Sequence, residues 1–174
     1  MLDKMLPLNP VDVPVALRLA DAPEASYQRI SDDLGISPST AHKSVQRLQH
    51  AGLLRPESRT VNWLALRDFL GHGLRYVFPA RPGAVVRGVP TSHSGPPLAE
   101  HIRAEDAIVW PHAEGPATGA EIVPLYPQAL RLPARSPRVY ELLTLADALR
   151  VGRARERKLA MELLERRLNP ARRA

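Results

Sequence analysis

Apolar residues recur at helical spacing in the first third of the chain, just before a glycine. Tyr27, Ile30 and Leu34 lie at positions i, i+3 and i+7, which predicts a short amphipathic helix over 27–34. Gly35 follows directly, and glycine is the residue that most easily ends a helix in the left-handed conformation. The pattern therefore predicts a helix that stops in a tight turn.

A second helix is predicted immediately after this turn. Ser37 is a favourable N-cap and Pro38 a favourable first helical residue, so we expect the helix to span 38–51. Three apolar residues recur at i, i+4 and i+7 and are expected to face the core: Ala41, Val45 and Leu48. The opposite face carries hydrogen-bonding side chains and no acidic one: Ser39, Thr40, His42, Lys43, Gln46 and Arg47.

A polar helix held over a small core after a glycine turn is typical of a helix-turn-helix, which places its second helix in the major groove of DNA. Arg47 or Lys43 would then donate to guanine, and Gln46 would pair with adenine. Ser39 and Thr40 would contact phosphates or base edges. The alternative interpretation is the solvated face of an ordinary surface helix. The glycine turn, the cap and the lack of acidic residues together favour contact with DNA.

The same stretch resembles the winged helix-turn-helix of MarR-type and IclR-type bacterial transcriptional regulators. The resemblance covers about 11–64, a third of the chain. Three runs carry it: Ile-x-x-x-Leu-Gly-Ile-Ser over 30–37, Ser-Thr-Ala over 39–41, and Val-x-x-Leu-x-x-Ala-Gly-Leu-Leu over 45–54. It implies a DNA-binding regulator in which the second helix meets the DNA and the hairpin after Leu54 forms a wing.

The resemblance also implies a set of DNA-contacting residues, to which the wing adds two arginines. The set is Ser37, Ser39, Thr40, His42, Lys43, Gln46, Arg47, Arg55 and Arg59. The sequence departs from the pattern of these families in two places. Arg29 lies three residues after the expected cap Ser26, where these families often have an acidic residue that completes a capping box. The segment 55–59 is short, so only its two arginines would reach a phosphate.

Further helices and strands are predicted around this domain. Asn9-Pro10 is a suitable start for an opening helix, and Asn62 is a suitable cap for a helix over 63–76 that contains two weakening glycines. The proline- and glycine-rich residues 79–133 contain three short candidate strands: 84–89, 107–110 and 121–125. This part is either an extended segment draped over the domain or a partner, or a small β unit that binds a ligand.

An apolar stripe marks the C-terminal region after the start signal Ser136-Pro137. We call the following residues the C-terminal stripe: Val139, Leu142, Leu143, Ala146, Leu149, Leu159 and Leu163. The region forms either one long helix kinked at Gly152 or two helices joined there. Because a small winged domain offers little surface to cover such a stripe, we predict a homodimer that forms through it.

The predicted fold is mainly α with a small β wing. It consists of a winged helix-turn-helix, then a proline-rich segment with short strands, then a long C-terminal helix or helix pair. The corresponding domain boundaries are 1–78 for the DNA-binding domain, 79–133 for the segment with strands, and 134–174 for the basic C-terminal region.

Composition narrows the class of protein. The chain has 174 residues and no cysteine, which excludes disulfides, thiol catalysis and cysteine-ligated zinc. No apolar run approaches the roughly 18 residues of a membrane span and no signal-peptide pattern is present, so we expect a cytoplasmic protein without membrane contact. Residues 1–130 hold 12 Lys/Arg and 13 Asp/Glu, whereas residues 131–174 hold 12 and 5. The net charge of +6 therefore resides in the C-terminal region, which suits phosphates or an acidic partner.

Catalytic and metal-binding patterns are not found. The six histidines lack metal-ligand spacing, although His93, His101 and His112 lie near acidic residues. There is no glycine-rich phosphate loop and no Gly-x-Ser-x-Gly run. The neighbouring Asp32 and Asp33 are interpreted as the solvent face of their helix. We therefore expect a protein that is not an enzyme and that needs no metal or cofactor.

The leading functional hypothesis is a dimeric, sequence-specific repressor that reads an inverted repeat in double-stranded DNA through the helix at 38–51. The alternative is a winged-helix interaction module whose basic C-terminal helix docks an acidic partner protein. A third possibility adds a small-molecule effector site between the middle segment and the C-terminal helices. The surface potential over the helix at 38–51 discriminates between the first two, because a positive face favours DNA and a mixed apolar face favours protein.

Overall fold

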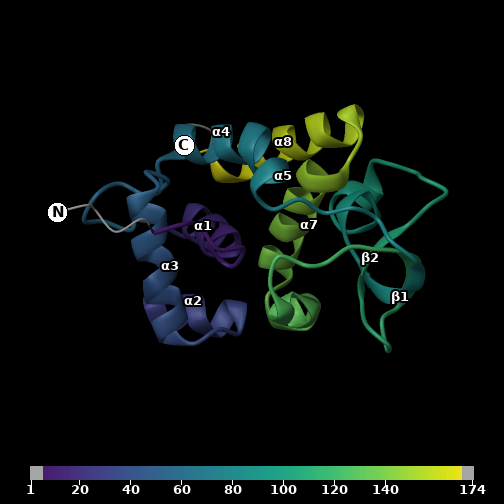
Figure 1. Ribbon diagram of the computed structural model, residues 1–174, viewed down its shortest axis with the longest axis horizontal. Coiled ribbons are helices and arrows are strands. Elements are labelled where there is room, and N and C mark those ends of the chain that lie inside the picture. The colour runs from purple at the N-terminus through teal and green to yellow at the C-terminus, as the bar shows by residue number, and fades with distance from the viewer. Residues whose placement is uncertain (1–5, 170–174) are drawn as a thin grey trace.

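The computed structural model describes residues 6–169, and its centre is a single buried helix, α7 (Pro137–Val151). The helix-turn-helix lies on one side of α7 and the strands lie on the other, as Figure 1 shows. The predicted fold class is confirmed, because the chain is mostly helical, carries one small sheet and ends in a pair of helices.

The first half of the chain is helical. Its elements are α1 (Asp12–Asp21), α2 (Tyr27–Leu34), α3 (Pro38–His50), α4 (Trp63–Asp68), a π-helical segment η1 (Phe69–Gly73) and α5 (Leu74–Val77). A single bridge between Leu54 and Val61 closes the wing. The predicted helix over 63–76 is thus present from its Asn62 cap onward, with the two predicted weak points, Gly71 and Gly73, inside or at the end of its π-helical part.

The second half contains the strands and the C-terminal helices. Its elements are β1 (Val85–Pro90), η2 (Ser92–Ser94), η3 (Leu98–Glu100), β2 (Ile108–Pro111), β3 (Ala117–Glu121), η4 (Pro127–Arg131), α6 (Leu132–Arg135), α7 and α8 (Ala154–Leu168). Of the two predicted arrangements after Ser136, the structure has two helices joined at Gly152.

The caps and the turn of the helix-turn-helix are confirmed. The Ser26 hydroxyl accepts a hydrogen bond from the amide of Arg29 at 3.1 Å, and the Ser37 hydroxyl accepts one from the amide of Thr40 at 3.0 Å. Gly35 has a φ of 68°, the left-handed conformation that ends α2. These local contacts explain why the boundaries of both helices follow from the sequence.

The three strands, which we call the β unit, close on themselves. β1 is antiparallel to both β2 and β3, and β2 and β3 pair in parallel. The third strand lies at 117–121, so the predicted strand at 121–125 was wrong except for its first residue. A Cβ on Gly119 would lie 2.5 Å from the Ala107 carbonyl oxygen, so the strand depends on small residues rather than on the β-branched ones that mark strands in a sequence.

The C-terminal stripe is covered by its own chain, which contradicts the reason for assigning it to a dimer interface. Each α7 member of the stripe is at most 3% exposed, and Leu163 on α8 is 7% exposed. Leu159 is partly buried against the same core. α7 packs against α1, α5, η2, α6 and α8, so its apolar residues surround the helix instead of forming one free face. A homodimer stays a prediction, but this stripe gives no support for it.

One hydrophobic core runs through the three predicted segments, from Val13 in α1 to Leu168 in α8. The boundaries at 78/79 and 133/134 stay predictions, and residues 1–5 and 170–174 of the outer segments lie outside the described residues. Within the described range, no helix combines the length and the apolar character that crossing a bilayer requires.

Candidate nucleic-acid interface

The outer face of α3 is polar. Its exposed side chains include Ser39, His42, Lys43 and Gln46, whereas Thr40 is partly buried and shares a hydrogen bond of 2.8 Å with the Ser37 hydroxyl. Among the described residues, no Asp, Glu or large exposed apolar side chain belongs to α3. The inner face is buried as predicted, with Ala41, Val45 and Leu48 each at most 2% exposed. This leaves one face of the helix available to a partner with hydrogen-bonding edges.

Arg47 does not belong to that free face. Its Nε and Nη2 donate to the two carboxylate oxygens of Asp12 at 2.8 and 2.6 Å, and Asp12 is 1% exposed. The hydroxyl of Ser44 donates to the same carboxylate at 2.6 Å. Since a bidentate, largely buried pair of this kind holds its arginine firmly, the structure gives Arg47 an intramolecular role in joining α3 to α1.

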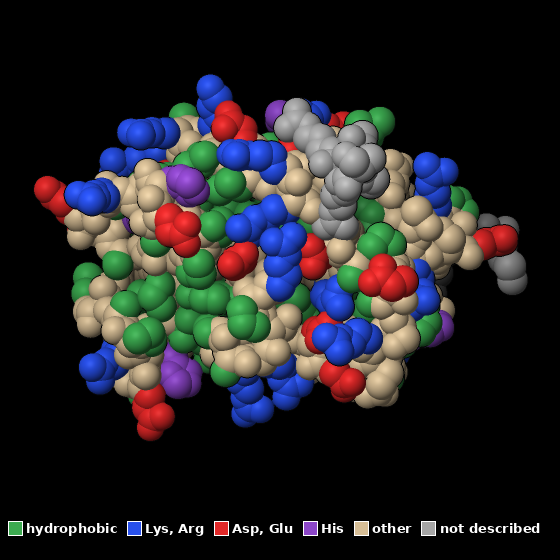
Figure 2. All heavy atoms as spheres, turned by 180° about the vertical axis from the view of Figure 1, so that it is seen from behind, with side chains coloured by type: hydrophobic (Ala, Val, Ile, Leu, Met, Phe, Trp, Pro, Cys, Tyr) green, Lys and Arg blue, Asp and Glu red, His purple; other side chains and the backbone are tan. Residues whose placement is uncertain are grey.

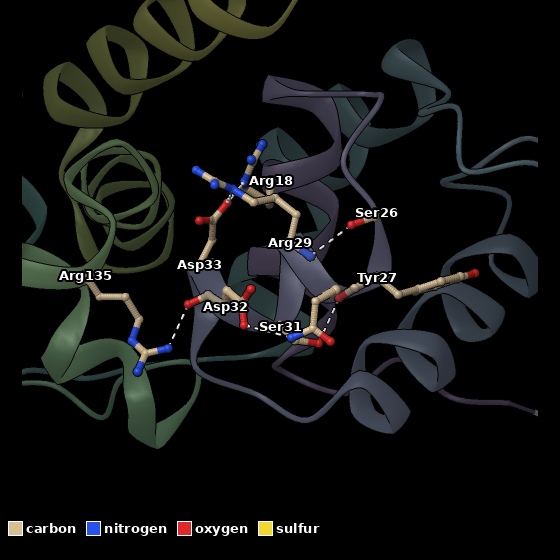
Figure 3. Close-up of polar contacts among 9 residues, drawn as sticks. Arg18, Ser26, Tyr27, Arg29, Ser31, Asp32, Asp33 and Arg135 are labelled. Atoms are coloured by element: carbon tan, nitrogen blue, oxygen red, sulfur yellow. Dashed lines mark hydrogen bonds and ion pairs between the residues drawn. The ribbon is translucent and has the colours of Figure 1, made fainter.

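The polar residues of α2 hold the first helix of the motif in place (Figure 3). Asp33 accepts from Arg18 of α1 at 2.7 Å and from Arg29 at 3.1 Å. Asp33 is only 9% exposed, so its interpretation as part of a solvent face was wrong. Asp32 is exposed as predicted, and its side chain accepts from Gln28 at 2.9 Å.

The wing is tied to α2 and α3 through a small aromatic contact. The Arg59 guanidinium lies 5.0 Å from the ring centre of Tyr27, and this ring is 5.1 Å from that of His42 on α3. Arg59 also donates to the Ala25 carbonyl at 2.5 Å. Arg59 is therefore engaged within the domain, whereas Arg55 is exposed and forms no ion pair within the described part of the chain.

Two side chains of the C-terminal half donate hydrogen bonds to the backbone at the end of α2. The Tyr126 hydroxyl donates to the Leu34 carbonyl at 3.0 Å, and Arg135 donates to the Asp32 carbonyl at 2.7 Å, a contact visible in Figure 3. Both acceptors belong to the last turn of α2, where helix carbonyls lack partners within the helix. Burial raises the pKa of Tyr126 well above its usual range, so its hydroxyl stays a donor. Sequence reasoning missed both residues, because 92 and 103 positions separate them from their acceptors.

Charge is locally mixed on the side of the molecule opposite to that seen in Figure 1. Figure 2 shows the face behind that of Figure 1, where basic and acidic side chains alternate around one broad region of hydrophobic side chains. That face therefore offers no surface of uniform positive charge to a nucleic acid.

Comparison with known families agrees with this geometry. Residues 17–58 match the IclR helix-turn-helix domain. The match runs from the middle of α1 through α2 and α3 to the wing, and it supports the IclR-type resemblance but not the MarR-type one. No curated protein and no solved structure matches the chain significantly. The IclR-type helix-turn-helix is a DNA-binding domain of transcriptional regulators, so this part of the chain is of a DNA-binding type.

Other candidate sites can now be placed. Within residues 6–169, no group of three His, Asp or Glu side chains is arranged to hold a metal ion. His93 lies 3.7 Å from a carboxylate oxygen of Glu156, whereas His101 and His112 are exposed. His93 lies within η2, His101 directly follows η3, and His112 directly follows β2.

Proposed function

We propose that this protein is a transcriptional regulator that binds double-stranded DNA through the exposed face of α3. The observation that carries the proposal is the polar, acid-free face of a helix inside a segment that matches an IclR-type helix-turn-helix. A helix of this size fits the major groove, where base edges present hydrogen-bond donors and acceptors.

The exposed side chains of α3 have distinct roles in the proposal. Gln46 is suited to a bidentate contact with adenine, and Lys43 to guanine or to a phosphate. Ser39 lies in the first turn of α3, where it is placed to contact a phosphate, with Ser37 and Thr40 beside it. Arg47 is excluded from base contact as long as it stays paired with Asp12. Specificity would then depend on Gln46, His42 and Lys43 rather than on an arginine.

Arg55 is the wing residue that we propose as a phosphate contact, because it is exposed and unpaired. Arg59 would act indirectly, by fixing Tyr27 and through it the position of His42. The finer form of the proposal is a repressor that reads an inverted repeat as a dimer. Because the C-terminal stripe is buried, the two copies would meet through another surface or only on the DNA.

The test is a mobility-shift titration of the whole chain at about 150 mM salt, with its own upstream DNA and random DNA of equal length. We expect binding at least about a hundredfold tighter to the upstream DNA. Lys43→Gln and Gln46→Ala should each weaken specific binding by roughly tenfold, whereas the exposed, remote Arg81→Gln should not. Arg55→Gln should lower the salt slope by about one.

The number of protein chains bound per DNA molecule tests the proposed dimer. Two successive shifted bands, or a single band that contains two chains per DNA, would support an inverted repeat. Equally weak binding to both DNAs would contradict the proposal. The interaction module would then be the better hypothesis, with the exposed Arg153, Arg155 and Lys158 at the start of α8 as its basic docking residues.

A further inference from the structure

A pocket of about 850 Å³ lies between the β unit and the corner that joins α7 to α8. Its walls come from the segment 102–108, from β3, and from residues 151–156. The apolar part of the lining includes Pro82, Val85, Ile102, Ile108, Ala120 and Val151. A cleft of a few hundred to about a thousand Å³ that combines apolar lining with polar groups is typical of sites for small organic molecules.

The rim of this pocket carries three arginines without partners. Arg103, Arg153 and Arg155 are exposed, and none forms an ion pair or a side-chain hydrogen bond with another described residue. Guanidinium groups in this state are available for charge-assisted hydrogen bonds to an anion.

The acidic residues of the pocket are either engaged within the protein or not gathered around one point. A carboxylate oxygen of Glu156 accepts from the Arg153 amide at 2.8 Å and lies 3.7 Å from Nδ1 of His93. Glu105 and Asp106 are exposed on the loop before β2. No three acidic or histidine side chains in the described range gather as a cation site, so the chemistry of the rim favours an anion.

Ser92, the residue before His93 of the pocket lining, has a strained backbone. Ser92 is fully buried with a φ of 54°, a conformation that non-glycine residues rarely adopt. Its hydroxyl is the buried side-chain polar atom that lacks a hydrogen-bond partner among residues 6–169. Next to it, Nε2 of His93 lies 2.7 Å from the Asp106 carbonyl oxygen and ties the pocket wall to the loop at 102–106. Strain and unsatisfied polar groups concentrate at functional sites.

We propose that this pocket binds a small amphipathic organic anion. Its apolar part would lie against Val85, Ile108 and Val151, and its carboxylate or phosphate would bind Arg153 and Arg155. The occupant is defined by charge and shape, so a simple alkyl anion is a suitable probe. The proposal stands independently of DNA binding, because no residue of the pocket belongs to the helix-turn-helix.

The test is isothermal titration calorimetry of the whole chain with four eight-carbon probes: octanoate, octyl phosphate, octanol and octylammonium. We expect saturable binding of the two anions, and binding of octanol and octylammonium at least about tenfold weaker. A difference between octanoate and octyl phosphate would identify the preferred head group.

Matched variants locate the site. Arg153→Gln combined with Arg155→Gln should weaken octanoate binding by at least about tenfold and leave octanol unchanged, because only the head-group contact is removed. The control combines Arg131→Gln with Arg166→Gln, two exposed arginines outside the pocket, and should bind octanoate like the unmodified protein. Thermal unfolding of each variant confirms that it is folded.

Three results would overturn the proposal. One is the absence of saturable octanoate binding up to a concentration of about 10 mM. Another is equal affinity for all four probes, which would indicate partition onto apolar surface only. The last is an equal loss of octanoate binding in the pocket variant and in the control variant.

Discussion

Among residues 6–169, three aspartates lie buried where elements pack together, and each pairs with an arginine. The pairs are Asp12 with Arg47, Asp33 with Arg18, and Asp147 with Arg150. Asp147 also accepts from Thr91 and from the Trp110 indole, both at 2.7 Å. Burial raises the pKa of Asp147, although Arg150 and these hydrogen bonds act in the opposite direction. The first two pairs join α1 to α3 and to α2, whereas Asp147 and Arg150 both belong to α7. Removing one partner of a buried pair leaves a buried charge without compensation.

At the residue scale, Arg47→Met should destabilise the protein by about 3 kcal/mol, because the Asp12 carboxylate would stay buried without its arginine. Lys43→Met, on the same helix but exposed, should change the free energy of unfolding by less than about 0.5 kcal/mol. Urea denaturation of both variants measures the difference. At a temperature where both variants are folded, Lys43→Met should weaken DNA binding, whereas Arg47→Met should not. A stable Arg47→Met variant that loses base specificity would show that Arg47 leaves Asp12 when DNA binds.

At the scale of elements, α7 connects the helix-turn-helix side of the molecule to the β unit. Tyr140 of α7 donates its hydroxyl to the Pro90 carbonyl at the end of β1, at 2.5 Å, and its ring packs at 5.8 Å from that of Trp110 on β2. Arg150 at the other end of α7 donates to the carbonyls of Phe78 and Val123, which flank the β unit. The β unit is therefore held to α7 at both of the helix's ends.

This attachment predicts a specific sensitivity to alkali. Burial raises the pKa of Tyr140 to about 12, so the folded state favours the neutral phenol. The raised pKa stabilises the folded state in full below the pKa of a tyrosine in the unfolded chain, which is about 10. This stabilisation is lost as the pH rises towards 12. Tyr140→Phe should cost about 1 kcal/mol at neutral pH, because it loses the hydrogen bond to Pro90. As the pH rises from 10 to 12, the free energy of unfolding of the Tyr140→Phe variant should fall by on the order of 2 kcal/mol less than that of the unmodified protein. Denaturant unfolding at several pH values measures both, and parallel pH curves would contradict the prediction.

At the scale of the whole molecule, the helix-turn-helix is built into a larger core. Every residue from Asp12 to Ala20 of α1 is buried, because α2 and α3 cover one side of this helix and α7 and α8 cover the other. The last turn of α2 depends on Tyr126 and Arg135 for its carbonyl partners. The polar outer face of α3 is therefore positioned by both halves of the chain.

The consequence is that residues 1–78 alone should not unfold cooperatively. Without the C-terminal half, the outer face of α1 and the carbonyls of Asp32 and Leu34 would meet water, and the apolar area buried per residue falls steeply in so small a fragment. Far-UV circular dichroism of the fragment during urea titration should give a broad transition, against a steep one for the whole chain. A steep transition near the midpoint of the whole chain would instead show an independent domain.

The sequence by itself determined the elements whose signals are local. Ser26, Gly35 and Ser37 define the ends of α2 and the start of α3 through contacts within a few residues, so pattern and capping chemistry suffice. The polar face of α3 also follows from helical periodicity, which places Lys43 and Gln46 opposite Ala41 and Val45.

Only the tertiary structure decided which side chains of those elements are free. Arg47 has the same sequence character as Lys43, yet a carboxylate 35 positions away holds it. The apolar residues of α7 suit a dimer as well as a core, and what covers them depends on the whole fold. The strand at Ala117–Glu121 has little β propensity and forms because Gly119 permits close approach to the Ala107 backbone. In each case the deciding partner is distant in sequence, and a pattern read along the chain carries no information about distant partners.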